Sequence, residues 1–219
     1  MIEIKNLLDT SKTIAKEIFE NKTYPFEVLP EIGEFILKLQ KTLDENEFNV
    51  SDGNVYIHKS VKVYETANIF GPCIIDEGTE VRPGAFIRGN AIVGKNCVVG
   101  NSTELKNVII FDNVQVPHYN YVGDSVLGFK SHMGAGSITS NVKSDKTLVK
   151  VKDGEKIIET GLKKMGAVLG DNVEVGCNSV LNPGTIVGRQ SNIYPLSSVR
   201  GTVPANSIFK AQGNIVEKY

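Results

Sequence analysis

The chain has 219 residues and a formal net charge of −1, from 24 Lys and Arg against 25 Asp and Glu. Hydrophobic residues make up 41% of it, which is enough for a packed core and excludes a disordered chain. The balanced charge offers no basic field, so we expect neither nucleic acid nor a membrane surface as a partner.

The three cysteines, Cys73, Cys97 and Cys177, are an odd number without the spacing of a zinc cluster. A chain of this length does not need disulfide bonds to fold, so the pattern favours the reducing cytoplasm. The first residues, MIEIKNLLDTSKTIAKEIF, lack a sustained apolar run. We therefore expect neither a signal peptide nor a transmembrane span there.

The first 50 residues differ in composition from the rest and carry a net charge of −4, with six Lys and ten Asp or Glu. A helix is predicted after Ser11, a residue type common at helix N-caps, with Ile14 and Ile18 on its apolar face. Pro30 is predicted to open a second helix. Residues 1–52 are thus expected to form a small helical appendage that docks onto the rest of the chain or a neighbouring subunit, with capping of an open end as one hypothesis.

From residue 57 onward the apolar pattern repeats every six residues, interrupted by two five-residue steps and one insertion. Small residues such as Cys, Ala, Ser and Thr mostly occupy the position four residues after each aliphatic one. The aliphatic positions are Ile57, Val63, Ile69, Ile75, Val81, Ile87, Val93, Val99, Leu105, Ile110, Val116, Val122, Leu127, Met133, Leu169, Val175, Leu181, Val187, Ile193 and Val199.

A six-residue repeat predicts a triangular parallel β-helix, with one hexad for each side of the triangle and the aliphatic residue pointing inward. The fold class is therefore all-β. The β-helix is expected over residues 53–205, followed by a tail over 206–219. The 20 hexads are enough for six to seven coils, with three hexads to a coil. A β-sandwich would instead need alternation at period two along whole strands.

Residues 139–166 break the repeat. Asp153-Gly154, between TLVKVK and EKIIET, predicts a β-hairpin with a primed turn that protrudes from the coils. Seven lysines from Lys143 to Lys164 face only four acidic residues there. A long insertion of this charge is suited to binding a phosphorylated ligand, although a merely solvated loop is the alternative.

The chain contains three histidines, His58, His118 and His132. A catalytic zinc site would need three protein ligands that converge on the metal. Only His118 and His132 lie near each other in the sequence, and His58 is distant from both, so we expect no metal site. No P-loop and no dinucleotide-binding glycine motif is present. A glycine-rich loop followed by Arg or Lys is also missing, which disfavours nucleotidylyl transfer.

The segments RPGAFIRGN, VGNSTELKN, PHYNYVGD, MGAGSITSN and KKMGAVLGDNVEVGCNS, within residues 65–210, resemble the acetyltransferase half of bifunctional N-acetylglucosamine-1-phosphate uridylyltransferases. The hairpin and ETGLKKMGA resemble the archaeal-type sugar-1-phosphate nucleotidylyltransferase/acetyltransferases more closely. This resemblance implies a left-handed β-helix, a homotrimer with sites shared between subunits, acetyl-CoA as cosubstrate and a role in amino-sugar nucleotide biosynthesis.

The resemblance also implies roles for individual residues. The catalytic base corresponds to His118. Two departures from the family motifs, His132 in place of Asn and Pro117 in place of Gly, fall where the sugar is expected to bind. The implied acceptor-binding residues are Arg82, Lys106, Tyr121, His132, Asn141 and Lys164, with Lys146 competing with Lys164, and the implied coenzyme-binding residues are Ala135, Cys177 and Lys210.

The resemblance therefore implies an N-acetyltransferase that moves acetyl from acetyl-CoA to the amine of an amino-sugar phosphate of the glucosamine-1-phosphate type, without a metal, and we expect it in the cytoplasm. An amine attacks a thioester only after losing a proton, and an imidazole near pH 7 suits that task. Two alternatives stay open: a non-catalytic scaffold or regulatory subunit, and an O-acyltransferase that uses a longer acyl chain.

Overall fold

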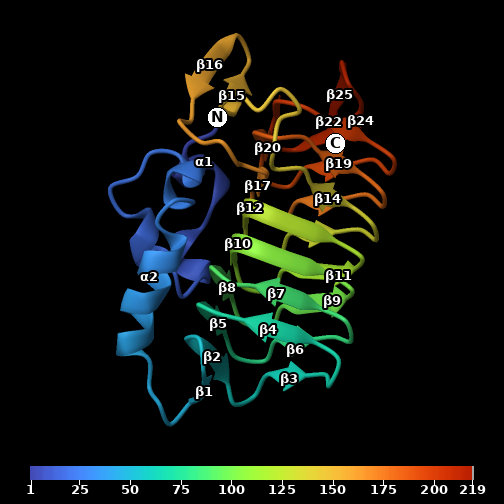
Figure 1. Ribbon diagram of the computed structural model, residues 1–219. Helices are drawn as coiled ribbons and strands as arrows, with labels where there is room; N and C mark the ends of the chain where they lie inside the picture. Colours follow the sequence, from blue (N-terminus) through green and yellow to red (C-terminus); the bar gives the residue numbers. More distant parts are fainter. Residues whose placement is uncertain (219) are drawn as a thin grey trace.

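The computed structural model describes residues 1–218, most of which form a left-handed parallel β-helix with three faces (Figure 1). The first face contains β2 (Val55–His58), β5 (Cys73–Ile75), β8 (Ala91–Val93), the later parts of β10 (Glu104–Ile110) and β12 (Tyr121–Leu127), β17 (Ala167–Leu169), β20 (Thr185–Val187) and β23 (Thr202–Val203), and β1 (Phe48–Ser51) adds antiparallel to β2.

The other two faces are built in the same way from short stacked strands. The second contains β4 (Asn68–Phe70), β7 (Phe86–Arg88), the early parts of β10 and β12, β14 (Ile138–Thr139), β19 (Val180–Leu181) and β22 (Ser198–Val199). The third contains β3 (Lys62–Val63), β6 (Glu80–Val81), β9 (Val98–Asn101), β11 (Gln115–His118), β13 (His132–Met133), β18 (Glu174–Val175), β21 (Asn192–Ile193), β24 (Ser207–Ala211) and the antiparallel β25 (Asn214–Glu217).

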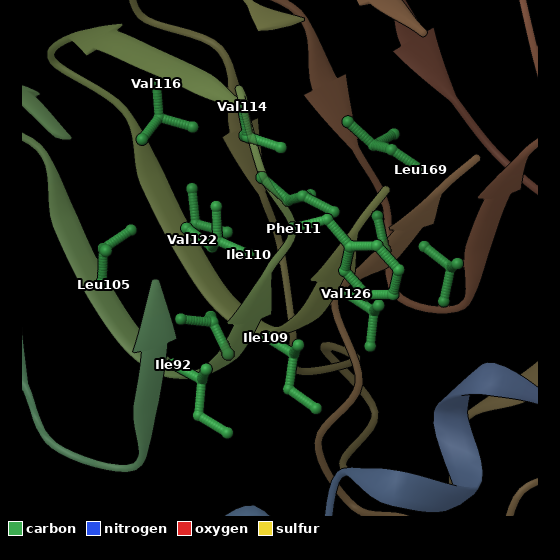
Figure 2. Close-up of a cluster of buried hydrophobic side chains, with 14 of the residues drawn as sticks. Ile92, Leu105, Ile109, Ile110, Phe111, Val114, Val116, Val122, Val126 and Leu169 are labelled. Atoms are coloured by element: carbon green, nitrogen blue, oxygen red, sulfur yellow. The ribbon is translucent and has the colours of Figure 1, made fainter. Parts of the chain in front are cut away.

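The predicted aliphatic positions stack in three columns, one for each face. On the first face Ile57 pairs with Ile75 and Ile75 with Val93, a spacing of 18 residues or three hexads. Val93 then pairs with Ile110 and Ile110 with Leu127, a spacing of 17 residues. The two five-residue steps seen in the sequence therefore shorten a coil by one residue without moving any aliphatic side chain out of its column. Figure 2 shows several of these side chains filling the interior.

Three inward positions were missed by the sequence pattern, so the β-helix is longer than six to seven coils. Thr139 occupies the column below Leu181, because its hydroxyl is satisfied by accepting a hydrogen bond from the backbone N–H of Gly123 at 2.9 Å. Val203 follows Val199 after only four residues and stacks on Val187. Phe209 stacks on Ile193 and is 1% exposed. The segment after residue 205, expected as a tail, thus begins with a strand of the third face.

The N-terminal residues differ from the two predicted helices. They form α1 (Ile4–Leu7), four 3₁₀ turns, η1 (Thr10–Lys12), η2 (Lys16–Phe19), η3 (Pro25–Val28) and η4 (Gln40–Thr42), and one longer helix, α2 (Ile32–Leu39). The predicted N-cap Ser11 is wrong: the cap of that turn is Asp9, whose side chain accepts hydrogen bonds from both the backbone N–H and the hydroxyl of Ser11. This turn ends at Lys12, because Thr13 is extended, and Ile18 lies in the next turn, η2.

This N-terminal segment lies along the first face rather than over an end of the β-helix (Figure 1). Phe19 packs edge-on against Phe111, with ring centroids 5.6 Å apart, and both side chains are buried. The buried Gln40 side-chain amide donates hydrogen bonds to the backbone oxygens of Asn54 at 2.8 Å and Cys73 at 3.2 Å. The first face is therefore covered, while no such layer covers the second and third faces within residues 1–218.

The predicted hairpin is present as β15 (Lys150–Asp153) and β16 (Lys156–Glu159). Its two-residue turn is Gly154-Glu155, one position later than expected, because Asp153 pairs directly with Lys156. Gly154 has a φ of +63°, as the first central residue of a primed turn requires. None of the helices in the described part of the chain is long and apolar enough to cross a lipid bilayer.

Candidate functional site

One edge of the β-helix, between the third and second faces, carries His118, Ala135 and Cys177 on successive coils; we call it the His118 edge. The backbone N–H of Gly136 donates to the oxygen of His118 at 3.0 Å, and that of Asn178 donates to the oxygen of Ala135 at 2.8 Å. The structure thus aligns the predicted base with two predicted coenzyme positions, about 5 Å apart from coil to coil.

His118 itself combines a fixed backbone with an exposed side chain. It ends β11, and its backbone N–H donates to the side-chain oxygen of Asn120 at 3.1 Å. Asn120 is 2% exposed, and its amide also donates to the backbone oxygens of Gly134 and Ser137 on the next coil. A general base needs both a fixed backbone and an exposed side chain, because its imidazole must contact the substrate from a well-defined position.

The second face carries a row of hydrogen-bonded polar side chains. It starts at Tyr121, the first residue of β12, which follows the strand that ends at His118. The Tyr121 ring lies over Gly123, where a Cβ atom would come within 2.5 Å of the Tyr121 hydroxyl oxygen. The Asn141 amide donates to this oxygen at 3.2 Å and also to the carboxylate of Asp124. Because Asn141 is the donor, the Tyr121 hydroxyl keeps its own proton for a ligand.

Burial raises the pKa of Tyr121, and the nearby carboxylates of Asp124 and Glu104 raise it further, against the opposing hydrogen bond from Asn141. The ordinary pKa of a tyrosine is already about 10. Its phenol therefore stays protonated in the physiological range and acts as a hydrogen-bond donor rather than as a base.

Asp124 connects the hydrogen-bonded side chains of Tyr121 and Asn141 to Lys106. The sequence had not indicated a role for Asp124. Its carboxylate accepts hydrogen bonds from Lys106 Nζ at 3.0 and 3.2 Å and from the side-chain amide of Asn107 at 3.0 Å. The residue is 4% exposed and has a φ of +47°. We call this side of the molecule, between the second and first faces, the Asp124 edge. The signal that could have indicated it is the final Asp of PHYNYVGD, a charged residue in a strand that has no other charged residue.

The two candidate hairpin lysines differ in position. Lys164 directly precedes Met165, whose backbone N–H donates to the oxygen of Asn141 at 3.0 Å. Lys146 is exposed in a turn with a φ of +60°, and its backbone N–H bonds to the oxygen of Lys143. The structure thus brings the backbone of Lys164, but not that of Lys146, next to the Asp124 edge.

Arg82 follows β6 at the His118 edge, two coils before His118. Its Nε atom pairs with the Glu80 carboxylate at 3.0 Å, and the side chain remains partly exposed. Gly100 lies on the coil between them, where a Cβ atom would come within 1.6 Å of the Pro117 backbone oxygen. Gly100 thus lets its own coil stack closely on that of Pro117, while Asn101 is the residue of the Gly100 coil that pairs with His118.

Two predicted residues lie on the third face, away from the polar chain on the second. His132 starts β13, and its Nδ1 atom is 2.8 Å from a carboxylate oxygen of the exposed Glu174. Lys210 follows Phe209 on β24, two coils beyond the coil of Val175. The structure does not bring His132 together with Tyr121 or Asn141, whereas Lys210 lies toward the far end of the His118 edge.

The three cysteines are free and fall into two classes. Burial raises the pKa of both Cys73 and Cys97 to about 12, whereas Cys177 is exposed on the His118 edge. Among residues 1–218, no group of three or more His, Cys, Asp or Glu side chains is arranged to hold a metal ion.

We expect only Cys177 of the folded protein to react rapidly with an aromatic disulfide reagent, because a thiolate is the reactive form and the other two thiols are buried and protonated. The measurement is thiol release at neutral pH, before and after denaturation. All three thiols should react in denaturant, and Cys177→Ala should remove the fast reaction. Rapid modification of Cys73 or Cys97 in the folded protein would contradict this assignment.

Comparison with known proteins places these features in context. The family model described as the GMPPB C-terminal domain matches residues 69–193. The bifunctional sugar-1-phosphate nucleotidylyltransferase/acetyltransferase of Sulfurisphaera tokodaii is 33% identical over 186 residues, which cover 77% of this chain and 46% of that protein. The bifunctional protein GlmU of Methanococcus vannielii is 36% identical over 222 residues, which cover 98% and 53%.

The chain therefore spans about half the length of the curated relatives it matches. Among solved structures, a putative acetyltransferase of Bacillus cereus is similar with a TM-score of 0.44 and 16% sequence identity, over 76% of this chain and 79% of that one.

Proposed function

The chain belongs to the family of the GMPPB C-terminal domain, and from this membership and the site geometry we propose that it is an acetyl-CoA-dependent N-acetyltransferase. Its acceptor is the amine of an amino-sugar phosphate of the glucosamine-1-phosphate type. The names of its relatives include acetyltransferase activity and sugar-1-phosphate chemistry, which supports both parts of the proposal.

The observation that carries the proposal is the position of His118. Its exposed imidazole stands on the edge that also carries Ala135 and Cys177, next to the Tyr121 and Asn141 chain of the second face. In the proposed reaction the amine nitrogen attacks the thioester carbonyl carbon, His118 accepts a proton from the amine, and the C–S bond breaks. The coenzyme leaves as a thiolate that is then protonated.

The remaining residues bind and orient the substrates. Tyr121 donates a hydrogen bond to the sugar, and Lys106 and Lys164 neutralise the phosphate of the sugar. Arg82, on the opposite edge of the second face, would reach the same phosphate from a neighbouring subunit. Backbone N–H groups near Ala135 would stabilise the oxyanion that develops on the thioester. The Lys106 ammonium contacts the Asp124 carboxylate, which positions it before a phosphate binds.

We further propose a homotrimer in the cytoplasm, with each site shared between subunits. The N-terminal segment covers the first face, so the second and third faces are free to meet other chains. The His118 edge lies between these two faces, which supports a site that a neighbouring subunit completes.

The test is a thiol-release assay with acetyl-CoA and a panel of amino-sugar phosphates, including glucosamine-1-phosphate and galactosamine-1-phosphate. We expect release with at least one amino sugar and none with the matching sugar that carries a hydroxyl in place of the amine. Release with the hydroxyl sugar, or with longer acyl thioesters only, would favour O-acyl transfer. Absence of acetyl-CoA binding by calorimetry would favour a scaffold role.

A further inference from the structure

A basic cavity of about 380 Å³ lies between the hairpin and the C-terminal half of the Asp124 edge. Figure 1 shows the hairpin standing beside β17 and β20 at this end of the molecule. The lining residues that matter here are Ser140, Lys143, Lys150, Lys152, Asn182 and Arg200. Ser140 adjoins Asn141, so the cavity begins where the polar chain of the proposed acceptor site ends.

The hairpin is held against the β-helix, so the cavity has fixed walls. The Thr202 hydroxyl donates a hydrogen bond to the backbone oxygen of Lys152. Gly184 has a φ of +81°, and a Cβ atom there would come within 2.7 Å of the Lys150 backbone oxygen, so a glycine allows this close contact. Val151 of the hairpin is fully buried.

The cavity has four cationic side chains and no acidic residue in its lining. Two of the cations are partly neutralised from outside it, Lys143 by Asp145 at 3.2 Å and Lys150 by Glu159 at 2.7 Å. Within residues 1–218, Lys152 and Arg200 form no ion pair. Two positive charges thus face the cavity without a protein counterion.

We propose that this cavity is a second anion-binding site, which takes a phosphate group other than the one next to the reacting sugar. The proposal rests on the proposed function and extends it. Phosphate is the group expected because Arg binds it through paired hydrogen bonds while Lys supplies point charges. Two phosphorylated groups could supply it: the second phosphate of a nucleoside-diphosphate amino sugar, or the 3′-phosphate of the coenzyme.

The structure favours the acceptor as the source. The cavity continues the Asp124 edge, which carries Lys106 and Asn141, whereas the coenzyme positions Ala135 and Cys177 lie on the His118 edge across the second face. An acceptor of the glucosamine-1-phosphate type has one phosphate, which Lys106 would bind. A nucleoside-diphosphate amino sugar with one phosphate at Lys106 could extend its second phosphate along the same edge into the cavity without crossing that face.

The experiment is calorimetric titration of the full chain with three separate probes: inorganic pyrophosphate, UDP and adenosine 3′,5′-bisphosphate. The variant is Lys152→Ala with Arg200→Ala, and the matched control is Lys156→Ala, which removes a hairpin lysine that does not line the cavity. Both cavity residues are exposed, so we expect the double variant to fold normally. It should bind the recognised probe at least about tenfold more weakly.

Weaker binding of pyrophosphate and UDP in the double variant alone would support the site and assign it to the acceptor. Weaker binding of the bisphosphate alone would support the site and assign it to the coenzyme. Equal affinities in the unmodified chain, the double variant and the control would overturn the proposal. These titrations do not require turnover, so a chain without acetyl transfer would refute the proposed function and leave this test intact.

Discussion

Replacing His118 with alanine is expected to lower the rate of acetyl transfer by about 10²- to 10⁴-fold, the usual contribution of a positioned general base. The imidazole is exposed, and the hydrogen bond from this residue to Asn120 comes from its backbone N–H. Removing the side chain should therefore leave folding and the binding of both substrates nearly unchanged. The measurement is steady-state thiol release, with the melting temperature as the folding readout.

His132→Ala is the matched control, because it removes an imidazole from the third face, where its partner is Glu174. We expect this variant to keep most of its turnover. If His118→Ala retained full turnover, the proposed base would be wrong. If both variants lost activity equally, the acceptor would have to reach the third face, which the position of Tyr121 and Asn141 on the second face disfavours.

The six-residue pattern predicted the β-helix because a buried column tolerates few polar side chains, so the same kind of residue recurs at each coil. Ile57, Ile75, Val93 and Ile110 stack as their spacing requires. The pattern failed at Thr139, where a local hydrogen bond satisfies a buried hydroxyl. It also could not anticipate the N-terminal turns, whose short apolar runs are stabilised mainly by contacts with the first face.

The candidate site was predictable only in part. The family resemblance implied His118, Tyr121 and Asn141, and the coils bring the last two into hydrogen-bond contact although 20 residues separate them. The role of Asp124 depends on donors from the coils before and after it, Lys106 and Asn107 on one and Asn141 on the other, which no local pattern encodes. The choice between Lys146 and Lys164 likewise depends on how the hairpin returns to the β-helix.

Replacing Asp124 with alanine is expected to lower the free energy of unfolding by about 2 to 4 kcal/mol, because it leaves the donors of Lys106, Asn107 and Asn141 without their shared acceptor. The loss should be smaller than for a fully buried ion pair, since the Lys106 side chain remains 27% exposed. Denaturant unfolding followed by circular dichroism measures it.

Asp124→Asn separates the structural role of this residue from its charge. Asparagine tolerates the left-handed backbone conformation at this position, where φ is +47°, so the variant should be more stable than the alanine one. Its amide offers one acceptor and two donors, and the donors would face the Lys106 ammonium and the Asn141 amide. We therefore expect a higher KM for the acceptor with a smaller change in kcat, since the displaced groups bind the sugar phosphate and His118 stays in place. Unchanged KM in a stably folded Asp124→Asn protein would show that Asp124 supports the fold alone, and Lys106 would then bind phosphate without its help.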